Sequence, residues 1–188
     1  MRRLIISALL LFSIMTLATG ILYPLLVTGL ARLLFPFTSQ GSLRQQNGVI
    51  IGSELIAQDV GDSAYFWPRP STSYYGTMPS GARNLGPLSR ELGTQAAKRQ
   101  EEWIRANGSD PSVPLEMLSA SASGLDPEIS PEAAMAQLNR VARVRHWKPG
   151  QAKAAEELIK KHTERPLFNF IGTTRINILL LNLALDDI

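Results

Sequence analysis

The first 37 residues constrain this chain more than any other part of it. After Met1-Arg2-Arg3 the sequence is apolar from Leu4 to Phe37, and Arg32 is the only charged residue on the way. Such a run is stable in a lipid bilayer or deep inside a large protein, and 188 residues build no interior large enough to bury it. A helix spans a bilayer with about 20 apolar residues. We therefore predict a membrane anchor over residues 1–37, with the span over about residues 5–31.

The same run also has features of a cleaved secretory signal. A signal has about 7–15 apolar residues before a small-residue cleavage site, and Ala18-Thr19-Gly20 fits such a site. The apolar residues nevertheless continue from Ile21 to Val27 and on to Ala31. This length favours a retained anchor. Cleavage near Gly20, which would free a secreted binding module, is the alternative.

The charges that flank the span predict its orientation. Arg2 and Arg3 precede the span, and Arg32 follows it. Positive residues near the ends of a span favour the cytoplasmic side of the membrane. We therefore expect the N-terminus in the cytoplasm and residues 38–188, as a single domain, outside it.

A proline inside the span predicts a disturbed helix. Pro24 lacks a backbone N–H, and its ring clashes with the carbonyl of Gly20, four residues earlier. Neighbouring helices and nearby threonine hydroxyls usually supply the partner for a carbonyl freed in this way. Gly20 and Gly29 also let another helix approach closely. We predict a kinked span that packs against a partner helix, and a plain tether that tolerates a kink is the alternative.

The charge and cysteine content of residues 38–188 exclude several classes of protein. Three of the 19 basic residues lie in the anchor, which leaves 16 against 16 acidic residues in the rest of the chain. A nucleic-acid-binding domain would carry a basic patch or stripe, so no nucleic-acid partner is expected. The chain has no cysteine, which rules out a disulfide scaffold and a thiolate metal site.

The pattern of residues 38–188 predicts a mixed α+β domain. Asn47-Gly48 is a type I′ hairpin signal between two short strands. Tyr65–Pro70 has aromatic strand character, but its two prolines confine it to a sheet edge or an irregular segment. Apolar spacing and capping residues predict three helices, over residues 88–107, from Ser130-Pro131 to about residue 144, and over about residues 149–161. Residues 176–185 are apolar on both alternate faces, which predicts a buried central strand.

Residues suited to catalysis are few. His146 and His162 each lie near the end of a predicted helix, where a cation interacts favourably with the helix dipole. The sequence contains no metal-ligand cluster, no nucleophile elbow, no Gly-x4-Gly-Lys-Ser/Thr phosphate loop and no Asp-Lys-Thr-Gly phosphorylation site. These features indicate an interaction or assembly subunit without a catalytic site or a cofactor of its own.

Two loop segments have an unusual composition. Met78–Pro87 contains two glycines and two prolines, which require defined turns. Leu118–Pro131 is rich in small hydroxylated residues and leads into a capped helix start, a place that can hold an anion. We name Ser121, Ser123 and Gly124 as a possible nucleotide or anion contact. The alternative is a structural loop whose serines satisfy neighbouring backbone groups.

Taken in order, these segments resemble the C subunit of the Kdp potassium-transporting ATPase, a bacterial inner-membrane complex. The resemblance covers nearly the whole chain, so it is specific. It includes Gly20, Tyr23 and Pro24 in the span, which favours a helix packed against other subunits. The matching segments are Thr19–Leu25, Gly41–Leu43, Gly52–Gln58, Tyr65–Ser71, Asn84–Pro87, Ser123–Ala134, Asn139–Arg145 and Arg175–Leu185.

The resemblance implies a non-catalytic subunit of an ATP-driven potassium uptake pump. In that family a channel-like subunit passes the ion and a P-type subunit hydrolyses ATP. The small subunit is described as an assembly factor and as a catalytic chaperone that raises the affinity of the P-type subunit for ATP. ATP would then act through the complex, and the partners would be these two subunits and the lipid bilayer. Because the predicted orientation places the domain outside the cytoplasm, any effect on ATP would pass through the membrane helix.

A membrane-anchored hydrolase is the alternative from a different class of function. A membrane-anchored hydrolase could use Ser119, Ser121 or Ser123 as nucleophile, with His146, His162 or a lysine as its base. Turnover of an ester or a nucleotide by the purified chain would favour the hydrolase. Copurification with two larger membrane proteins would favour the pump subunit.

Overall fold

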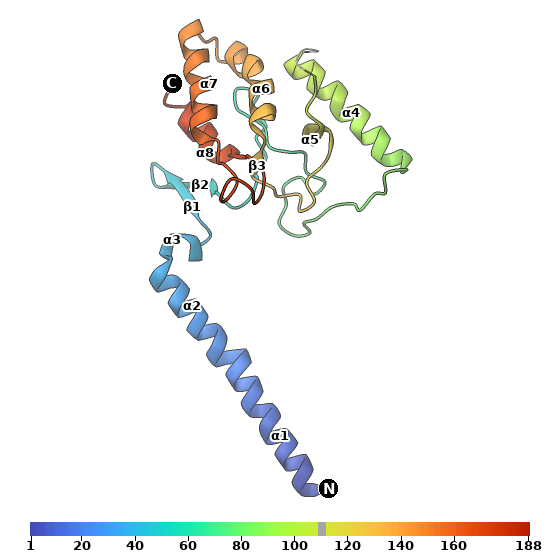
Figure 1. Cartoon of the computed structure of the whole chain (residues 1–188), viewed down its shortest axis with the longest axis vertical. Coiled ribbons are helices and arrows are strands. Elements are labelled where there is room, and N and C mark those ends of the chain that lie inside the picture. Colours follow the sequence, from blue (N-terminus) through green and yellow to red (C-terminus); the bar gives the residue numbers. More distant parts are fainter. Residues whose placement is uncertain (109–111) are drawn as a thin grey trace. The chain divides into compact units, whose positions relative to one another are not determined.

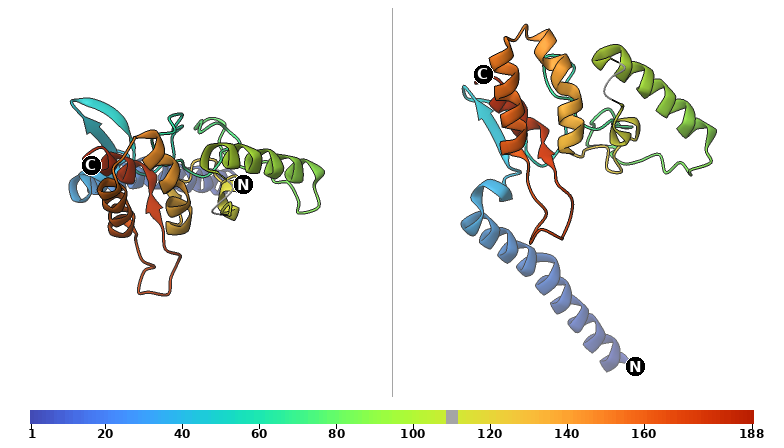
Figure 2. Two further views of the ribbon diagram at one scale, coloured as in Figure 1. Left: turned by 90° about the horizontal axis from the view of Figure 1, so that it is seen from above. Right: turned by 45° about the horizontal axis from the view of Figure 1, so that its top comes forward.

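A computed structural model describes residues 1–108 and 112–188 of the chain. These residues form two compact units, Met1–Ile51 (unit 1) and Gly52–Ile188 (unit 2). Figure 1 labels their elements, and Figure 2 gives two further views. The α+β prediction is confirmed, because one apolar N-terminal helix precedes a domain of mixed helices and strands.

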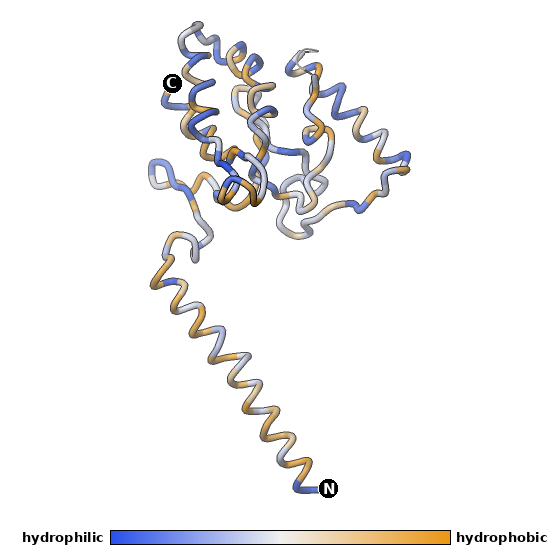
Figure 3. The backbone as a smooth tube through the Cα atoms, viewed as in Figure 1, coloured by the Kyte–Doolittle hydropathy of each residue, from blue (hydrophilic) through white to orange (hydrophobic). Residues whose placement is uncertain are grey.

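Unit 1 begins with a helix of 33 residues, Arg2–Leu34, which is long and apolar enough to cross a membrane. It consists of α1 (Arg2–Leu17), the π-helical turn η1 (Ala18–Leu22) and α2 (Tyr23–Leu34). None of its residues is buried by the described chain, and most of its length is hydrophobic (Figure 3). The short helix α3 (Pro36–Ser39) follows.

The disturbance that Pro24 predicts takes the form of the π-helical turn. The Tyr23 N–H bonds the carbonyl of Ala18, five residues earlier, and Pro24 has no N–H to offer Gly20. One-turn π-bulges are a recognised way for a helix to absorb such a break. The hydroxyl of Thr19 donates to the carbonyl of Met15 at 2.7 Å, so it serves a different carbonyl from the one freed by proline.

The predicted hairpin is confirmed. Strands β1 (Leu43–Gln46) and β2 (Val49–Ser53) pair, and Asn47 and Gly48 have φ values of 53° and 79°. Positive φ at both central residues is the requirement of a type I′ turn, which asparagine and glycine meet at little cost. Unit 1 thus extends past the predicted anchor of residues 1–37 and includes α3 and most of the hairpin.

The three predicted helices of unit 2 are also confirmed. They are α4 (Arg90–Asn107), α6 (Pro131–Val144) and α7 (Pro149–His162), and a short helix α5 (Leu115–Leu118) lies between the first two. The Ser89 hydroxyl caps α4, and Gly108, with φ of 92°, ends it. The Ser130 hydroxyl accepts the N–H of Ala133 and caps α6, as its sequence pattern indicates.

The prediction of a buried central strand over residues 176–185 is wrong. Only Ile176–Asn177 (β4) is extended, and it pairs antiparallel with β3 (Glu128–Ile129). The Asn177 side chain then accepts the N–H of Leu180 at 3.2 Å and starts helix α8 (Ile178–Leu185). A run that is apolar on every side fits a buried helix as well as a buried strand, and leucine and alanine favour the helix.

The core of unit 2 lies where α8 packs against α7 and β4, and α7 in turn against α6. It is mostly aliphatic and includes aromatic side chains from the 65–67 segment and from α4. Its buried hydrophobic residues are Phe66, Trp103, Met117, Ile129, Ala133, Ala134, Ala136, Val141, Ala155, Ile159, Ile176, Ile178, Leu181 and Leu185.

The backbone of the irregular segment at Tyr65–Trp67 is hydrogen-bonded to side chains. In the described part of the chain, no strand pairs with it. The Asn182 amide exchanges two hydrogen bonds of 2.9 Å with the N–H and C=O of Phe66. The Gln137 amide does the same for Trp67, at 2.8 and 3.1 Å. The buried Arg140 guanidinium donates to the Tyr65 carbonyl and stacks 3.9 Å from the Trp67 ring centroid. Side-chain groups therefore satisfy backbone groups of this segment that a neighbouring strand would otherwise pair.

Candidate functional site

The membrane helix is the first candidate site. Gly20, Tyr23, Pro24 and Gly29, which are predicted to pack against a partner helix, are all exposed. A Cβ added at either glycine would meet no atom beyond its neighbours and its own helix. Gly20 and Pro24 are about one turn apart and share a side, whereas Gly29 lies about two and a half turns from Gly20 on another side. The positions are open to a partner, and their packing stays a prediction.

A group of adjoining hollows in unit 2 is the second candidate. They lie between α4 and the irregular segments that precede and follow it, and Arg99 lines each of three. We call the hollow with aromatic lining residues the aromatic hollow (about 330 Å³). A second one, lined by two loop segments, is the loop hollow (about 310 Å³). The aromatic hollow is lined by Asp59, Val60, Trp67, Pro68, Pro70, Ser71, Tyr74, Tyr75, Arg99, Glu102, Trp103 and Met117.

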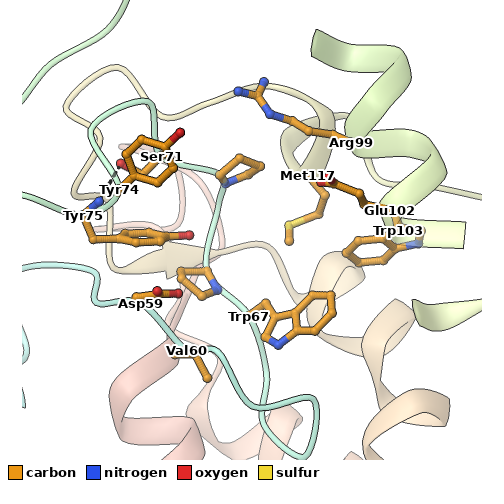
Figure 4. Close-up of a pocket in the computed structure, with 12 residues that line it drawn as sticks. Asp59, Val60, Trp67, Ser71, Tyr74, Tyr75, Arg99, Glu102, Trp103 and Met117 are labelled. Carbon is orange, nitrogen blue, oxygen red and sulfur yellow. Dashed lines mark hydrogen bonds between the residues drawn. The ribbon is translucent and has the colours of Figure 1, made fainter. Parts of the chain in front are cut away.

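Figure 4 shows how the aromatic hollow is built. Tyr75 and Trp67 come from the irregular segment on one side, and Arg99 and Trp103 come from α4 on the other. The Tyr75 hydroxyl donates to the carbonyl of Arg69 at 3.1 Å, which fixes the ring. These side chains offer ring faces and hydrogen-bond donors, a set suited to recognition of a bound group.

Burial governs the ionisable groups of this hollow. Desolvation, helped by the nearby Asp59 carboxylate, raises the pKa of Tyr75 to about 12, so the phenol is neutral at physiological pH. Desolvation also lowers the pKa of the Arg99 guanidinium. That group donates to the Leu118 carbonyl at 2.8 Å and joins α4 to the end of α5. A neutral phenol and a fixed guanidinium can bind and orient a group, which is the chemistry the hollow supports.

The loop hollow brings together the two segments of unusual composition. The first contributes Ala82, Arg83, Asn84 and Leu85, and the second contributes Ser119, Ala120 and Ala122. Asn84 has φ of 53°, consistent with the defined turns expected of Met78–Pro87. The sequence indicates that each loop is special, and the structure adds that they share one surface.

Ser121, Ser123 and Gly124 belong to the second segment but are not among the residues that line the loop hollow. The N–H of Ser121, a buried residue, bonds the Pro70 carbonyl at 3.0 Å, and exposed Ser123 accepts the Leu125 N–H at 3.1 Å. Gly124 has φ of 71°, and a Cβ there would lie 2.7 Å from the hydroxyl of Ser73. These bonds have the form of a structural loop. A nucleotide or anion contact at the three residues stays a prediction.

The start of helix α6 already holds an anionic group of the chain itself. The Glu116 carboxylate accepts the N–H of Ser130 at 3.1 Å and also accepts its hydroxyl. A carboxylate at a helix N-terminus is favoured by the helix dipole and the unpaired N–H groups. This position, which the sequence marks as able to hold an anion, is therefore occupied by Glu116.

Two of the candidate hydrolase serines are hydrogen-bonded to backbone groups of neighbouring residues. The Ser119 hydroxyl donates to the Leu115 carbonyl at 3.2 Å, and the Ser123 hydroxyl accepts the N–H of Leu125 at 3.1 Å. Within the described ranges, neither His146 nor His162 is hydrogen-bonded to one of these serines. The same ranges contain no group of three or more residues able to hold a metal ion.

The residues predicted from the sequence do not include Tyr75 and Arg99. The sequence analysis makes no prediction for residues 72–77, which contain Tyr75, and it predicts the helix that contains Arg99 from its apolar positions. One signal was available, because Tyr74-Tyr75 is an aromatic pair in a segment otherwise rich in serine and threonine. Nothing in the sequence placed Arg99 opposite that pair.

Known proteins of one family match this chain over almost its full length. A family model described as the c chain of the K⁺-transporting ATPase matches residues 5–187. The potassium-transporting ATPase KdpC subunit of Variovorax paradoxus is 47% identical over 191 residues, which cover 99% of this chain and 97% of the relative. The subunit of the same name from Dechloromonas aromatica is 42% identical over 193 residues, covering 100% and 99%. That from Methylococcus capsulatus is 44% identical over 183 residues, with 95% of each covered.

Proposed function

Since this chain belongs to the KdpC family of potassium-transporting ATPase subunits, we propose that it stabilises the pump complex and raises the ATP affinity of the P-type subunit. It does so without a catalytic site or cofactor of its own. Its partners are the channel-like subunit, the P-type subunit and the lipid bilayer. ATP acts through the complex.

The observation that carries this proposal is the uncovered helix of unit 1. Over Arg2–Leu34 none of the residues is buried by the described chain. Each large apolar side chain left in water forgoes about 1.5–3 kcal/mol of burial free energy. More than a dozen such side chains are exposed, among them Leu9, Phe12 and Leu26. Lipid and partner helices are the surroundings that remove this cost.

The small residues of the helix support subunit packing in addition to lipid contact. Helices in a bilayer associate by close backbone approach, for which glycine and alanine leave room. Gly20, within the π-helical turn, and Gly29 provide two such places on different sides. One helix can therefore contact two neighbours, a geometry suited to a subunit that holds a complex together.

The arginines at the start of the helix support the orientation. Arg2 and Arg3 precede the span, so the N-terminus lies in the cytoplasm and unit 2 lies outside. ATP is then on the opposite side from unit 2, and the effect on ATP affinity passes through the helix. A C-terminal alkaline phosphatase fusion checks this orientation, because the enzyme is active only outside the cytoplasm. An inactive phosphatase fusion, together with an active C-terminal fusion to a reporter that works only in the cytoplasm, would contradict it.

The function itself is tested on the purified pump with and without this subunit. We expect omission to lower recovery of the intact complex and to raise the ATP concentration for half-maximal hydrolysis. Gly20→Leu should reproduce both effects by blocking helix contact, while Leu26→Ile, matched in size and apolarity, should reproduce neither. Equal ATP dependence with and without the subunit would refute the proposed effect on ATP. Equal recovery would refute the assembly role.

A further inference from the structure

A turn near the C-terminal end of unit 2 exposes an unusual amount of apolar surface. We call residues 167–171 the apolar turn; Leu167, Phe168, Phe170 and Ile171 are 63%, 73%, 76% and 52% exposed. The turn is the tip of the segment that connects α7 to β4, and Figure 2 shows this segment projecting from the rest of unit 2. Surface patches of large apolar side chains mark sites of interaction with a protein or a membrane.

The apolar turn is an ordered structure. Leu167 and Ile171 form a two-way bridge, with N–H to carbonyl distances of 3.0 and 2.9 Å. The rings of Phe168 and Phe170 stack with centroids 6.3 Å apart. Below the turn, Glu164 and Arg175 form a second bridge and an ion pair of 3.1 Å. The phenyl rings are therefore presented together on a braced stem.

The backbone of the turn gives a second, independent observation. Phe168 has φ of 53° and Asn169 has φ of 64°. Asparagine tolerates this left-handed conformation, but a bulky phenylalanine is strained in it. The Phe168 side chain gains little burial within unit 2 in return. Strain without internal compensation indicates that the residue is used in a contact outside the chain.

Charged residues of both signs lie around the turn. From Arg165 to Arg175 the sequence contains two arginines and no acidic residue, and both arginines are exposed. Lys160 and Lys161, at the end of α7, add two exposed cations. Lys160 pairs with Glu156, and Arg175 pairs with Glu128 and Glu164. Aromatic side chains flanked by arginine and lysine are typical of segments that sit at the headgroup level of a bilayer.

We propose that the apolar turn inserts Phe168 and Phe170 into the headgroup region of a lipid bilayer. The bilayer is favoured as the occupant because the chain carries its own membrane-spanning helix. Only residues 35–51 separate this helix from unit 2, and 17 residues reach at most about 60 Å even when fully extended. Tethering keeps the turn at high effective concentration near lipid, so a weak insertion is sufficient.

The inference rests on the proposed anchoring of the chain by Arg2–Leu34, and the experiment separates the two. The chain contains no cysteine, so Phe170→Cys provides a single site for an environment-sensitive fluorophore. Leu88→Cys, at a residue 99% exposed in unit 2, is the matched control. The full-length chain is reconstituted in vesicles of phosphatidylcholine and phosphatidylglycerol that contain a lipid with a nitroxide near its headgroup.

We expect the label at position 170 to be quenched several-fold more than the label at position 88. Equal quenching of the labels at positions 170 and 88 would overturn the proposal. If, in addition, the label at position 170 becomes protected when the pump is assembled, a partner subunit occupies the turn instead of lipid. Flotation of the vesicles reports anchoring separately. A chain that fails to float with the vesicles refutes the anchor, whatever the labels show.

A second variant distinguishes membrane insertion from a structural role. Phe168→Asn removes one phenyl group and relieves the left-handed strain, so its denaturation midpoint should be unchanged or raised. In the Phe170→Cys background we expect it to reduce quenching several-fold. A lowered midpoint with undiminished quenching would show that Phe168 serves the fold, and would overturn the proposal.

Discussion

Replacing Asn182 by alanine should destabilise unit 2 by about 2–5 kcal/mol, because two buried backbone groups lose their partners at once. The Asn182 amide accepts the Phe66 N–H and donates to the Phe66 carbonyl, each at 2.9 Å. Phe66 is fully buried and Asn182 is 8% exposed, so water does not replace these bonds without opening the core. Each unsatisfied group costs about 1–3 kcal/mol. The higher helix propensity of alanine returns roughly 0.5 kcal/mol.

The measurement is denaturant unfolding of the full-length chain in detergent, followed by tryptophan fluorescence. All three tryptophans, Trp67, Trp103 and Trp147, lie in unit 2, so the signal reports on that unit. The matched control is Asn139→Ala, at an exposed asparagine on α6. We expect this control to be neutral or slightly stabilising. If Asn182→Ala costs less than about 1 kcal/mol, the idea that side-chain amides replace a missing strand is refuted.

Three further changes test other parts of unit 2 by the same unfolding measurement. Gly124→Ala should cost about 1–3 kcal/mol because φ is 71° there, whereas Gly93→Ala, inside α4 with open space around it, should stabilise by roughly 0.5–1 kcal/mol; equal effects would contradict the assigned backbone. Glu116→Ala should cost about 1–2 kcal/mol by removing the acceptor at Ser130, and no loss would show that the cap is dispensable. The pKa of Tyr75 is raised from 10 to about 12, so the folded state keeps a proton that the unfolded state releases. The stability of the wild type relative to Tyr75→Phe should therefore be constant below pH 10 and should fall by up to about 2 kcal/mol as the pH rises to 12; a difference that stays flat across this range would contradict the buried phenol.

The elements that the sequence determined are those fixed by neighbouring residues. An apolar run without acidic residues suffices to define a membrane-length helix, and Asn47-Gly48 suffices to define a hairpin turn. Ser89 and Ser130 start their helices with bonds to residues three positions away. Local φ/ψ preferences and nearby hydrogen bonds carry this information, so a linear pattern can reveal it.

Tertiary structure decided the features whose partners are distant in the chain. Asn182 and Phe66 are 116 residues apart, and only their pairing explains why the aromatic segment needs no neighbouring strand. The run after Asn177 is compatible with a strand or a helix, and its burial within unit 2 together with the Asn177 cap selected the helix. Arg99 and Tyr75 line the same hollow because α4 lies opposite the loop that precedes it. Sequence periodicity reports which residues are apolar, whereas the choice of partner depends on packing and hydrogen-bond satisfaction across the whole domain.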